Sequence, residues 1–151
     1  MVLKHISAKI QQNFEKFSYF CGANSLMKEN YFSGTVIHGL NNGEKFGFKT
    51  ANIQIEKGET PQTGIYAVKI FINHQTYLGM LYVGTRPSLN LTQLTVEVHL
   101  FDMDADLYHQ QITVEVVKKI REEIKFETVK ALIAQLEKDK MQVLQVFTHF
   151  P

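Results

Sequence analysis

Two polar residues near the middle of the chain have types and a spacing that suit phosphate chemistry. Thr50 and Asn52 stand two residues apart, so on an extended chain their side chains project to the same side. A hydroxyl and an amide carbonyl are hard oxygen donors, which Mg²⁺ accepts while it keeps several waters and substrate phosphates. The same spacing occurs on the solvent-facing side of an ordinary strand, so the pair alone leaves both interpretations open.

Glu97 is the second residue that could carry chemistry. Alternation on an extended chain divides its neighbourhood into two faces, with Thr95, Glu97, His99 and Phe101 on one and Val96, Val98 and Leu100 on the other. A carboxylate on a rigid strand beside a ligand can act as a general base. It can equally be an exposed strand residue, and periodicity does not choose between the two.

Other polar segments give weaker signals. The glycine-bearing stretch 38–47 could cradle phosphates through its backbone N–H groups, but hairpins also contain Asn-Gly and no Walker motif is present. Arg121, Glu122 and Glu123 could form a solvated, charge-paired turn. The six histidines show no spacing typical of metal ligands, so zinc is not expected.

The elements that must position these residues are mainly β. Short strands are predicted at 31–38, 46–55, 64–73, 76–83, 94–101 and 111–118, joined by turns without crossover helices. This pattern favours a closed, six-stranded antiparallel β-barrel. Residues 1–30 have a helical apolar stripe and predict a helical lead-in to a domain spanning 31–151.

A C-terminal helix is predicted after the last strand. Its apolar residues fall mainly on one face, and Thr128 is a candidate N-cap. We expect this helix to lie against the barrel and to cover an opening or an edge.

Composition sets broad limits on function. The chain has 151 residues, enough for one domain, and a net charge of +1, so no strong field favours nucleic acid or an anionic membrane. Cys21 is the single cysteine, which fits a reducing compartment. No apolar run approaches the roughly 20 residues of a membrane helix. We therefore expect a cytoplasmic protein, a monomer that binds small molecules and neither nucleic acid nor membrane.

Taken in order, the segments from about Ser33 to Asp139 resemble the riboflavin kinase (flavokinase) family, including the C-terminal kinase module of bacterial bifunctional riboflavin kinase/FAD synthetase. Eight motifs carry the resemblance: Ser-Gly-Thr-Val-Ile-His-Gly at 33–39, Gly-Phe-Lys-Thr-Ala-Asn at 47–52, Gly-Ile-Tyr-Ala-Val at 64–68, Tyr-Leu-Gly-Met at 77–80, Val-Gly-Thr-Arg-Pro at 83–87, Glu-Val-His-Leu-Phe-Asp at 97–102, Asp-Leu-Tyr at 106–108 and Ile-Arg-Glu-Glu-Ile-Lys-Phe at 120–126.

The resemblance implies a six-stranded antiparallel barrel with a C-terminal helix, and transfer of the ATP γ-phosphoryl group to the 5′-hydroxyl of riboflavin, giving FMN and ADP. It implies that Glu97 is the catalytic base and that Thr50 and Asn52 hold Mg²⁺. The implied nucleotide-binding residues are Gly39, Lys45, Thr50, Asn52 and His99. The implied flavin-binding residues are Asp106, Leu107, Tyr108, Arg121, Glu123 and Phe126.

Residues 1–30 resemble the linker that follows the adenylylating domain of the bifunctional enzymes, so FAD synthesis is not expected from this chain. Two positions depart from the family pattern. Lys49 stands where proline is usual, and His109 stands where glycine is usual, in a turn expected to need positive φ. These departures motivate an alternative hypothesis, a catalytically impaired flavin- or nucleotide-binding barrel with a regulatory role.

Overall fold

The computed structural model describes residues 30–38, 47–85, 94–103 and 106–149. The predicted helical lead-in lies outside these residues, except for its last one. Within them the elements are β1 (Tyr31–Ile37), β2 (Ala51–Gly58), β3 (Gly64–Ile72), β4 (Gln75–Gly84), β5 (Thr95–Leu100), β6 (Gln111–Arg121) and α2 (Val129–His149). The six predicted strands are therefore confirmed.

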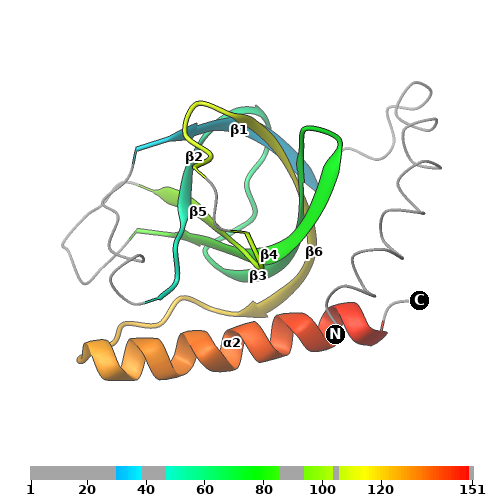
Figure 1. The fold of residues 1–151 in the computed structure, drawn as a ribbon. Helices are drawn as coiled ribbons and strands as arrows, with labels where there is room; N and C mark the ends of the chain where they lie inside the picture. The colour runs from blue at the N-terminus through cyan, green and yellow to red at the C-terminus, as the bar shows by residue number, and fades with distance from the viewer. Residues whose placement is uncertain (1–29, 39–46, 86–93, 104–105, 150–151) are drawn as a thin grey trace.

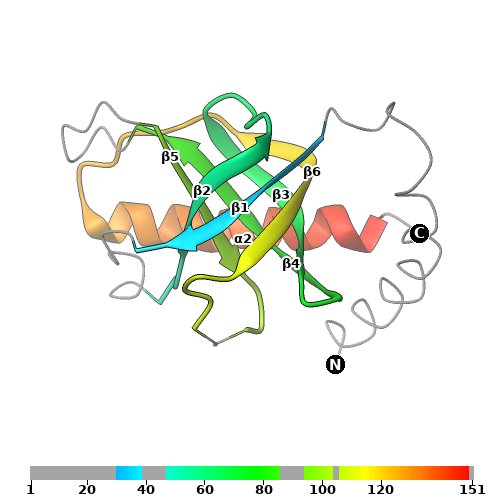
Figure 2. The same ribbon diagram turned by 90° about the horizontal axis from the view of Figure 1, so that it is seen from above.

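The strands close into one antiparallel barrel with the order β1-β2-β5-β4-β3-β6, β6 pairing back to β1. Figure 1 shows this barrel above α2, and Figure 2 shows the same arrangement turned by 90°. The predicted closed barrel is confirmed. The order also makes β2 and β5 neighbours, although β3 and β4 separate them along the chain.

Alternating side chains divide the apolar residues into two clusters. The barrel interior is filled by one face of each strand, which on β5 is Val96, Val98 and Leu100. The outer face of the wall carries a second cluster, in which Ala67 and Met80 pack against Val143 and Phe147 of α2. Burial of apolar surface on both sides of the wall therefore attaches the helix to the barrel.

Helix α2 begins where the sequence predicted it. The Thr128 hydroxyl accepts a hydrogen bond from the Ala131 amide at 3.1 Å, which is the geometry of an N-cap. The helix packs across the outer wall of β3, β4 and β6. The expectation that it covers an opening or an edge was wrong, because a closed barrel has no free edge and the apolar stripe of α2 matches the apolar outer wall.

A single lateral row of outward-facing residues runs around most of the barrel. Residues directly opposite one another in an antiparallel pair point to the same face. The pairings link, in order, Ile37, Asn52, Glu97, Tyr82, Ile65 and Arg121. The row crosses all six strands of the outer surface. Because the strands are staggered, Ile37 and Arg121 at its two ends lie near opposite ends of β6.

A β-bulge near the end of β6 changes which way its last residues point. The register between β3 and β6 shifts at Ile65/Tyr66, so Lys119 and Arg121 are paired to successive residues and Ile120 is the extra residue. Ile120 packs on the α2 side of the wall, and the side chain of Arg121 also reaches α2. Without the bulge, these two consecutive residues would face opposite sides of the wall.

Candidate active site

Glu97 lies at the centre of the lateral row and is only 7% exposed. The Thr50 hydroxyl donates to Glu97 Oε1 at 3.4 Å, and Asn52 lies directly opposite Glu97 in the β2–β5 ladder. The structure therefore brings together the three residues for which we predicted catalytic and metal-binding roles, although 47 positions separate Thr50 from Glu97.

The donors of this group are a hydroxyl, an amide and a carboxylate. Among the described residues, no cluster of three or more His, Cys, Asp or Glu side chains is placed to hold a metal ion. A hard cation bound by Thr50 and Asn52 would have to take its remaining ligands from water and substrate phosphates, as Mg²⁺ commonly does. The oxygen-only donor set fits that ion.

His99 fixes the turn that precedes Thr50. Its Nδ1 donates to the Lys49 carbonyl at 2.7 Å, so the backbone next to Thr50 is bonded to β5. The imidazole also contacts the rings of Phe48 and Phe101, with centroids 5.2 and 5.6 Å away. Burial lowers the pKa of His99 below its ordinary value of 6.5, which favours a neutral ring with its proton on Nδ1.

Glu123 approaches the lateral row from the segment that follows β6. Its Oε1 accepts hydrogen bonds from the Tyr82 hydroxyl at 2.5 Å and from the Thr85 amide at 3.3 Å. Because Tyr82 is the direct cross-strand neighbour of Glu97, two glutamates of the predicted site lie on either side of one tyrosine. A Cβ at Gly84 would clash with the Tyr82 ring and the Glu123 carboxylate, so glycine leaves the room that this contact needs.

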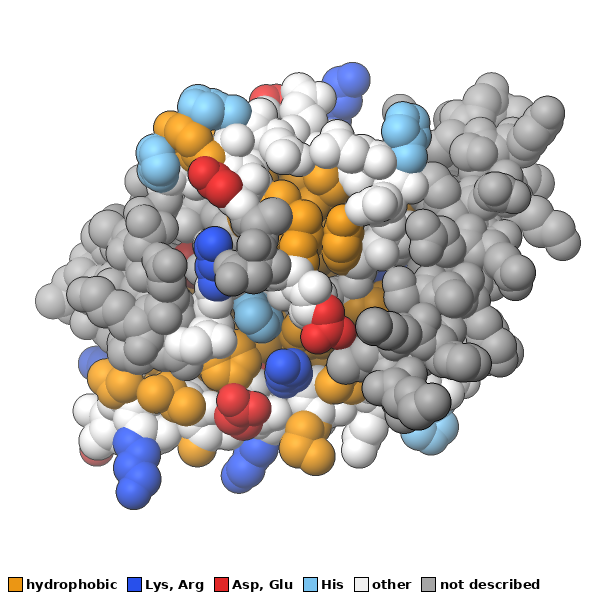
Figure 3. All heavy atoms as spheres, viewed as in Figure 1, with side chains coloured by type: hydrophobic (Ala, Val, Ile, Leu, Met, Phe, Trp, Pro, Cys, Tyr) orange, Lys and Arg blue, Asp and Glu red, His pale blue; other side chains and the backbone are white. Residues whose placement is uncertain are grey.

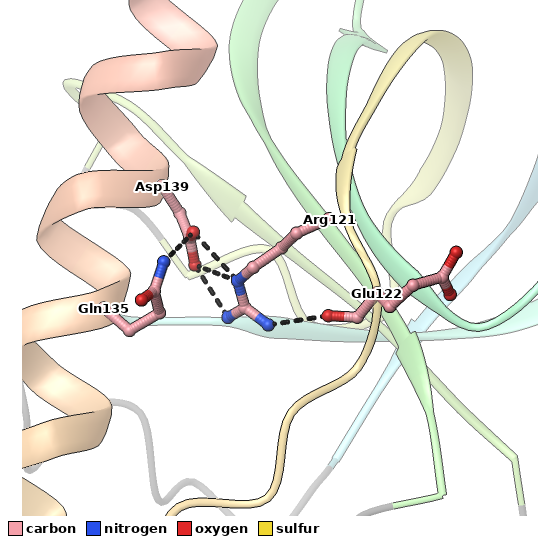
Figure 4. Close-up of polar contacts among 4 residues, drawn as sticks. All are labelled: Arg121, Glu122, Gln135 and Asp139. Carbon is pink, nitrogen blue, oxygen red and sulfur yellow. Dashed lines mark hydrogen bonds and ion pairs between the residues drawn. The ribbon is translucent and has the colours of Figure 1, made fainter.

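Arg121 is largely buried and paired with a carboxylate on α2 (Figure 4). Its Nε lies 2.9 and 3.0 Å from the two Asp139 oxygens, and its Nη2 lies 2.8 Å from Oδ2. Its Nη1 donates to the Glu122 carbonyl at 3.0 Å, and Gln135 Nε2 donates to Asp139 Oδ1 at 3.0 Å. The open hypothesis of a solvated turn is therefore wrong for Arg121, which is 14% exposed beside a carboxylate with no exposed area.

The face of the molecule seen in Figure 3 carries charges of both signs on its described residues. In Figure 3, hydrophobic side chains gather along α2 at the lower edge, with both positive and negative side chains between them. This mixture agrees with the net charge of +1. An anionic substrate would therefore be held by local hydrogen bonds and a bound cation rather than by a broad positive field.

Comparison with known proteins identifies the family. The family model described as riboflavin kinase (flavokinase) matches residues 26–147, which is most of the chain. The chain belongs to the riboflavin kinase family.

Individual relatives share sequence or fold with this chain. The chain is 39% identical over 132 residues to the bifunctional riboflavin kinase/FMN adenylyltransferase of Bacillus subtilis, covering 84% of this chain and 42% of that protein. It is similar to a solved structure described as a macrolide-efflux protein from Streptococcus pneumoniae (TM-score 0.68, 28% identity, 96% of this chain and 47% of the other). The fold also matches riboflavin kinase from Trypanosoma brucei (TM-score 0.57, 19% identity, 79% and 77% covered). The chain spans less than half the length of the curated relatives it matches.

The predicted flavin-binding residues of this riboflavin kinase family member fall into two separate groups. Arg121 ends β6, Glu123 and Phe126 follow it, and the Arg121 guanidinium stands 5.7 Å from the centre of the Phe126 ring. The segment 106–108 precedes β6, so the two groups lie at opposite ends of this eleven-residue strand. A flavin that contacts both would have to span much of the barrel wall, and the shared role stays a prediction.

The group before β6 is held by a turn of its own and by contacts with β1 and the barrel interior. Leu107 is buried in the barrel interior, and the Tyr108 amide donates to Asp106 Oδ1 at 2.9 Å. The Tyr108 ring stacks on His38 with centroids 3.6 Å apart. His109 has φ = 66°, so the expected positive-φ turn is present with histidine in place of glycine. Gly39 and Lys45, predicted to bind nucleotide, lie outside the described residues.

Sequence reasoning missed Tyr82, Gln135 and Asp139. A signal existed for Asp139, since it falls three residues after Leu136 and four before Val143, on the apolar stripe of α2. A carboxylate at such a position needs a buried partner. Tyr82 gave no comparable signal, because its role depends on which strands become neighbours.

No helix within the described residues is both long and apolar enough to cross a membrane.

Proposed function

We propose that this chain is a riboflavin kinase, which transfers the γ-phosphoryl group of ATP to the 5′-hydroxyl of riboflavin and releases FMN and ADP. The observation that carries the proposal is the buried Glu97 carboxylate, in contact with the Thr50 hydroxyl and opposite Asn52. Membership of the riboflavin kinase family supplies the substrates.

In this mechanism the oxygen of the riboflavin 5′-hydroxyl bonds to the γ-phosphorus, and Glu97 accepts the proton that this hydroxyl loses. The bond between that phosphorus and the β,γ-bridging oxygen breaks, and ADP leaves with the electron pair. Glu97 stands on a rigid strand and is nine-tenths covered, so its carboxylate is held in place before substrate arrives. Phosphoryl transfer depends mainly on such positioning and on neutralisation of charge.

The family uses ATP and a divalent metal, and we propose Mg²⁺ as that metal, with Thr50 and Asn52 as its protein ligands. When bound, the ion neutralises charge on the phosphates. The chain's own part is to keep both side chains on one side of β2, and His99 contributes by holding the Lys49 carbonyl. We further propose His99, Gly39 and Lys45 on the nucleotide side, and Glu123 and Phe126 on the flavin side.

The alternative of an impaired binding barrel has no support in the described residues. His109 adopts the left-handed conformation at the position where glycine is usual. The carbonyl of Lys49, where proline is usual, is fixed by His99. Both departures are thus accommodated without loss of Thr50, Asn52 or Glu97.

The test is FMN formation by the purified chain incubated with riboflavin, ATP and Mg²⁺, followed by HPLC, with EDTA added to a parallel sample. Metal-dependent FMN is the expected result. Folded protein that binds riboflavin in calorimetry but forms no FMN would favour the alternative instead. Protein that binds neither substrate would overturn both.

We also propose that the enzyme works as a monomer in the cytoplasm, on small-molecule substrates only. The single cysteine and the ATP requirement support a reducing, nucleotide-rich compartment. Sedimentation of the purified chain at working concentration tests the first point, and a mass of about 17.4 kDa is expected.

A further inference from the structure

The segment 122–128 connects β6 to α2 without regular secondary structure. It carries Glu123, whose carboxylate lies over Gly84 and is bonded to the Tyr82 hydroxyl and the Thr85 amide. An irregular connection usually has freedom to move. Something must therefore hold its first residues if Glu123 is to keep this position.

The Arg121–Asp139 pair supplies that restraint. Asp139 has no exposed area and comes from the middle of α2, while Arg121 is the last residue of β6. The guanidinium bonds both carboxylate oxygens through its planar fork and uses a third nitrogen to bind the Glu122 carbonyl. The same side chain therefore fixes the helix, the strand end and the backbone immediately before Glu123 (Figure 4).

Two further contacts define the geometry. Gln135 donates to Asp139 Oδ1, which orients the carboxylate toward Arg121. The β-bulge at Ile120 turns Arg121 to the α2 side of the wall. Its Nε, Nη1 and Nη2 are each bonded to protein oxygens, which uses three of the five N–H groups of Arg121 and directs the guanidinium toward α2 and the Glu122 carbonyl.

We propose that Arg121, Gln135 and Asp139 form a positioning unit, which sets Glu123 against Tyr82, the cross-strand neighbour of Glu97, and thereby determines affinity for the phosphoryl acceptor without touching it. This inference rests on the proposed function, because the acceptor is riboflavin. It assigns roles to Gln135 and Asp139, and it makes Arg121 a positioning residue instead of a direct flavin contact. The donor side is formed by Thr50, Asn52 and His99 on and beside β2 and β5, and none of the bonds described for the unit reaches these three residues.

The experiment compares Asp139→Asn with wild type. The KM for riboflavin should rise about tenfold, since small displacements of a positioning group have large effects. The KM for ATP should stay within about twofold, because the bonds described for the unit join β6, α2 and the segment after β6 and involve neither β2 nor β5. Glu122→Gln is the matched control. This substitution removes the ion pair between Lys119 and Glu122 (2.6 Å), next to Arg121 in the sequence. It should change neither the KM for riboflavin nor the KM for ATP.

A readout that needs no substrate accompanies the kinetics. In Asp139→Asn the Thr85 amide should exchange its hydrogen faster, because the Glu123 carboxylate that it bonds is no longer held. Amide exchange within β1 should be unchanged. If Asp139→Asn does not fold, Gln135→Ala and the double variant Arg121→Met/Asp139→Leu replace it, the latter because it leaves no buried charge unpaired.

The outcomes separate this inference from the proposed function. Wild type that forms no FMN overturns the proposed function, while Thr85 exchange and the riboflavin Kd, measured by flavin fluorescence, still test the unit. A lowered Tm with both KM values and Thr85 exchange unchanged would show that the pair only stabilises the fold. Equal increases in both KM values would show general loosening, and either result overturns the proposal.

Discussion

The two segments that flank β6 were predicted to serve the same ligand, yet the structure holds them by different means. The segment after the strand is attached by a buried ion pair to α2 and by the Glu123 bonds to β4. The segment before it is held by the Asp106–Tyr108 turn bond and by ring stacking on His38. It is also held by the His109 amide, which donates to the Val36 carbonyl of β1 at 3.0 Å, and by Leu107 in the barrel interior. A buried ion pair thus fixes the first segment, whereas apolar burial, backbone hydrogen bonds to β1 and an exposed turn fix the second.

This difference predicts unequal costs for removing the two aspartates. Asp139→Ala leaves the Arg121 guanidinium buried without its partner and should lower the free energy of unfolding by about 3–5 kcal/mol. Asp106→Ala removes one exposed hydrogen bond and should cost about 1 kcal/mol or less. Urea denaturation of both variants measures the two values. Equal losses would mean that the segments are held equally firmly.

Removing the hydroxyl of one tyrosine from each region extends the comparison of the two segments. Tyr82→Phe removes the hydrogen bond to the Glu123 carboxylate and should cost about 1–2 kcal/mol, since bonds to charged groups are the stronger ones. Tyr108→Phe keeps the stacked ring, and within the described residues no hydrogen bond from its hydroxyl is seen, so a change below about 0.5 kcal/mol is expected. Thermal unfolding of both variants in the same buffer measures the two losses of stability. A larger loss for Tyr108→Phe than for Tyr82→Phe would contradict the prediction.

Much of the fold could be predicted because its signals are local. Alternation around Glu97 assigned Val96, Val98 and Leu100 to the interior, and the Thr128 cap marked the start of α2. The contact between Thr50 and Glu97 was reached only through the family resemblance, since it requires β2 and β5 to be neighbours. The order in which the strands pair around the barrel depends on the whole barrel, and no spacing in the sequence predicts it.

The Arg121–Asp139 pair is a second contact that could not be predicted from the sequence. Its two residues are 18 positions apart on different elements, and the bulge that aims Arg121 is visible only in the strand register. A carboxylate on the apolar stripe of α2 indicated that a partner was needed, but nothing in the sequence indicated which one. Gly39 and Lys45 lie outside the described residues, so their nucleotide role stays a prediction.

His99, on the α2 side of the barrel, makes the stability of the fold depend on pH. Burial lowers the pKa of its imidazole in the folded state, with Lys140 acting in the same direction, so the unfolded chain binds this proton more readily. The contribution of neutral His99 to stability is therefore complete above about pH 6.5 and is lost as the pH falls through the lowered pKa of the folded state.

His99→Asn keeps an N–H donor near the position of Nδ1 and removes the titration. Its free energy of unfolding should fall less than that of wild type between pH 8 and pH 5. Identical pH profiles would show that His99 titrates alike in both states. His99→Gln moves the donor one bond farther out, and should raise the KM for ATP more than His99→Asn does.

The smallest effect is expected in the segment before β6. His109 has φ = 66°, a left-handed conformation that favours glycine, so His109→Gly should relieve strain. Greater flexibility of the unfolded chain offsets part of the gain, and the net stabilisation should be below about 1 kcal/mol. A loss of stability in denaturant titrations would mean that the contact between His109 and Tyr108, with ring centroids 3.7 Å apart, outweighs the backbone strain.

The central claim is that Glu97 accepts the proton of the acceptor hydroxyl, and its most direct test is the kcat of Glu97→Gln for FMN formation at saturating riboflavin, ATP and Mg²⁺. Glu56→Gln is the matched control, since it alters an exposed carboxylate of β2 that accepts bonds from Thr35 and Gln111. We expect kcat to fall by about 10²–10⁴-fold in Glu97→Gln, with circular dichroism unchanged, and to stay at the wild-type value in Glu56→Gln. A folded Glu97→Gln enzyme with wild-type kcat would contradict the account.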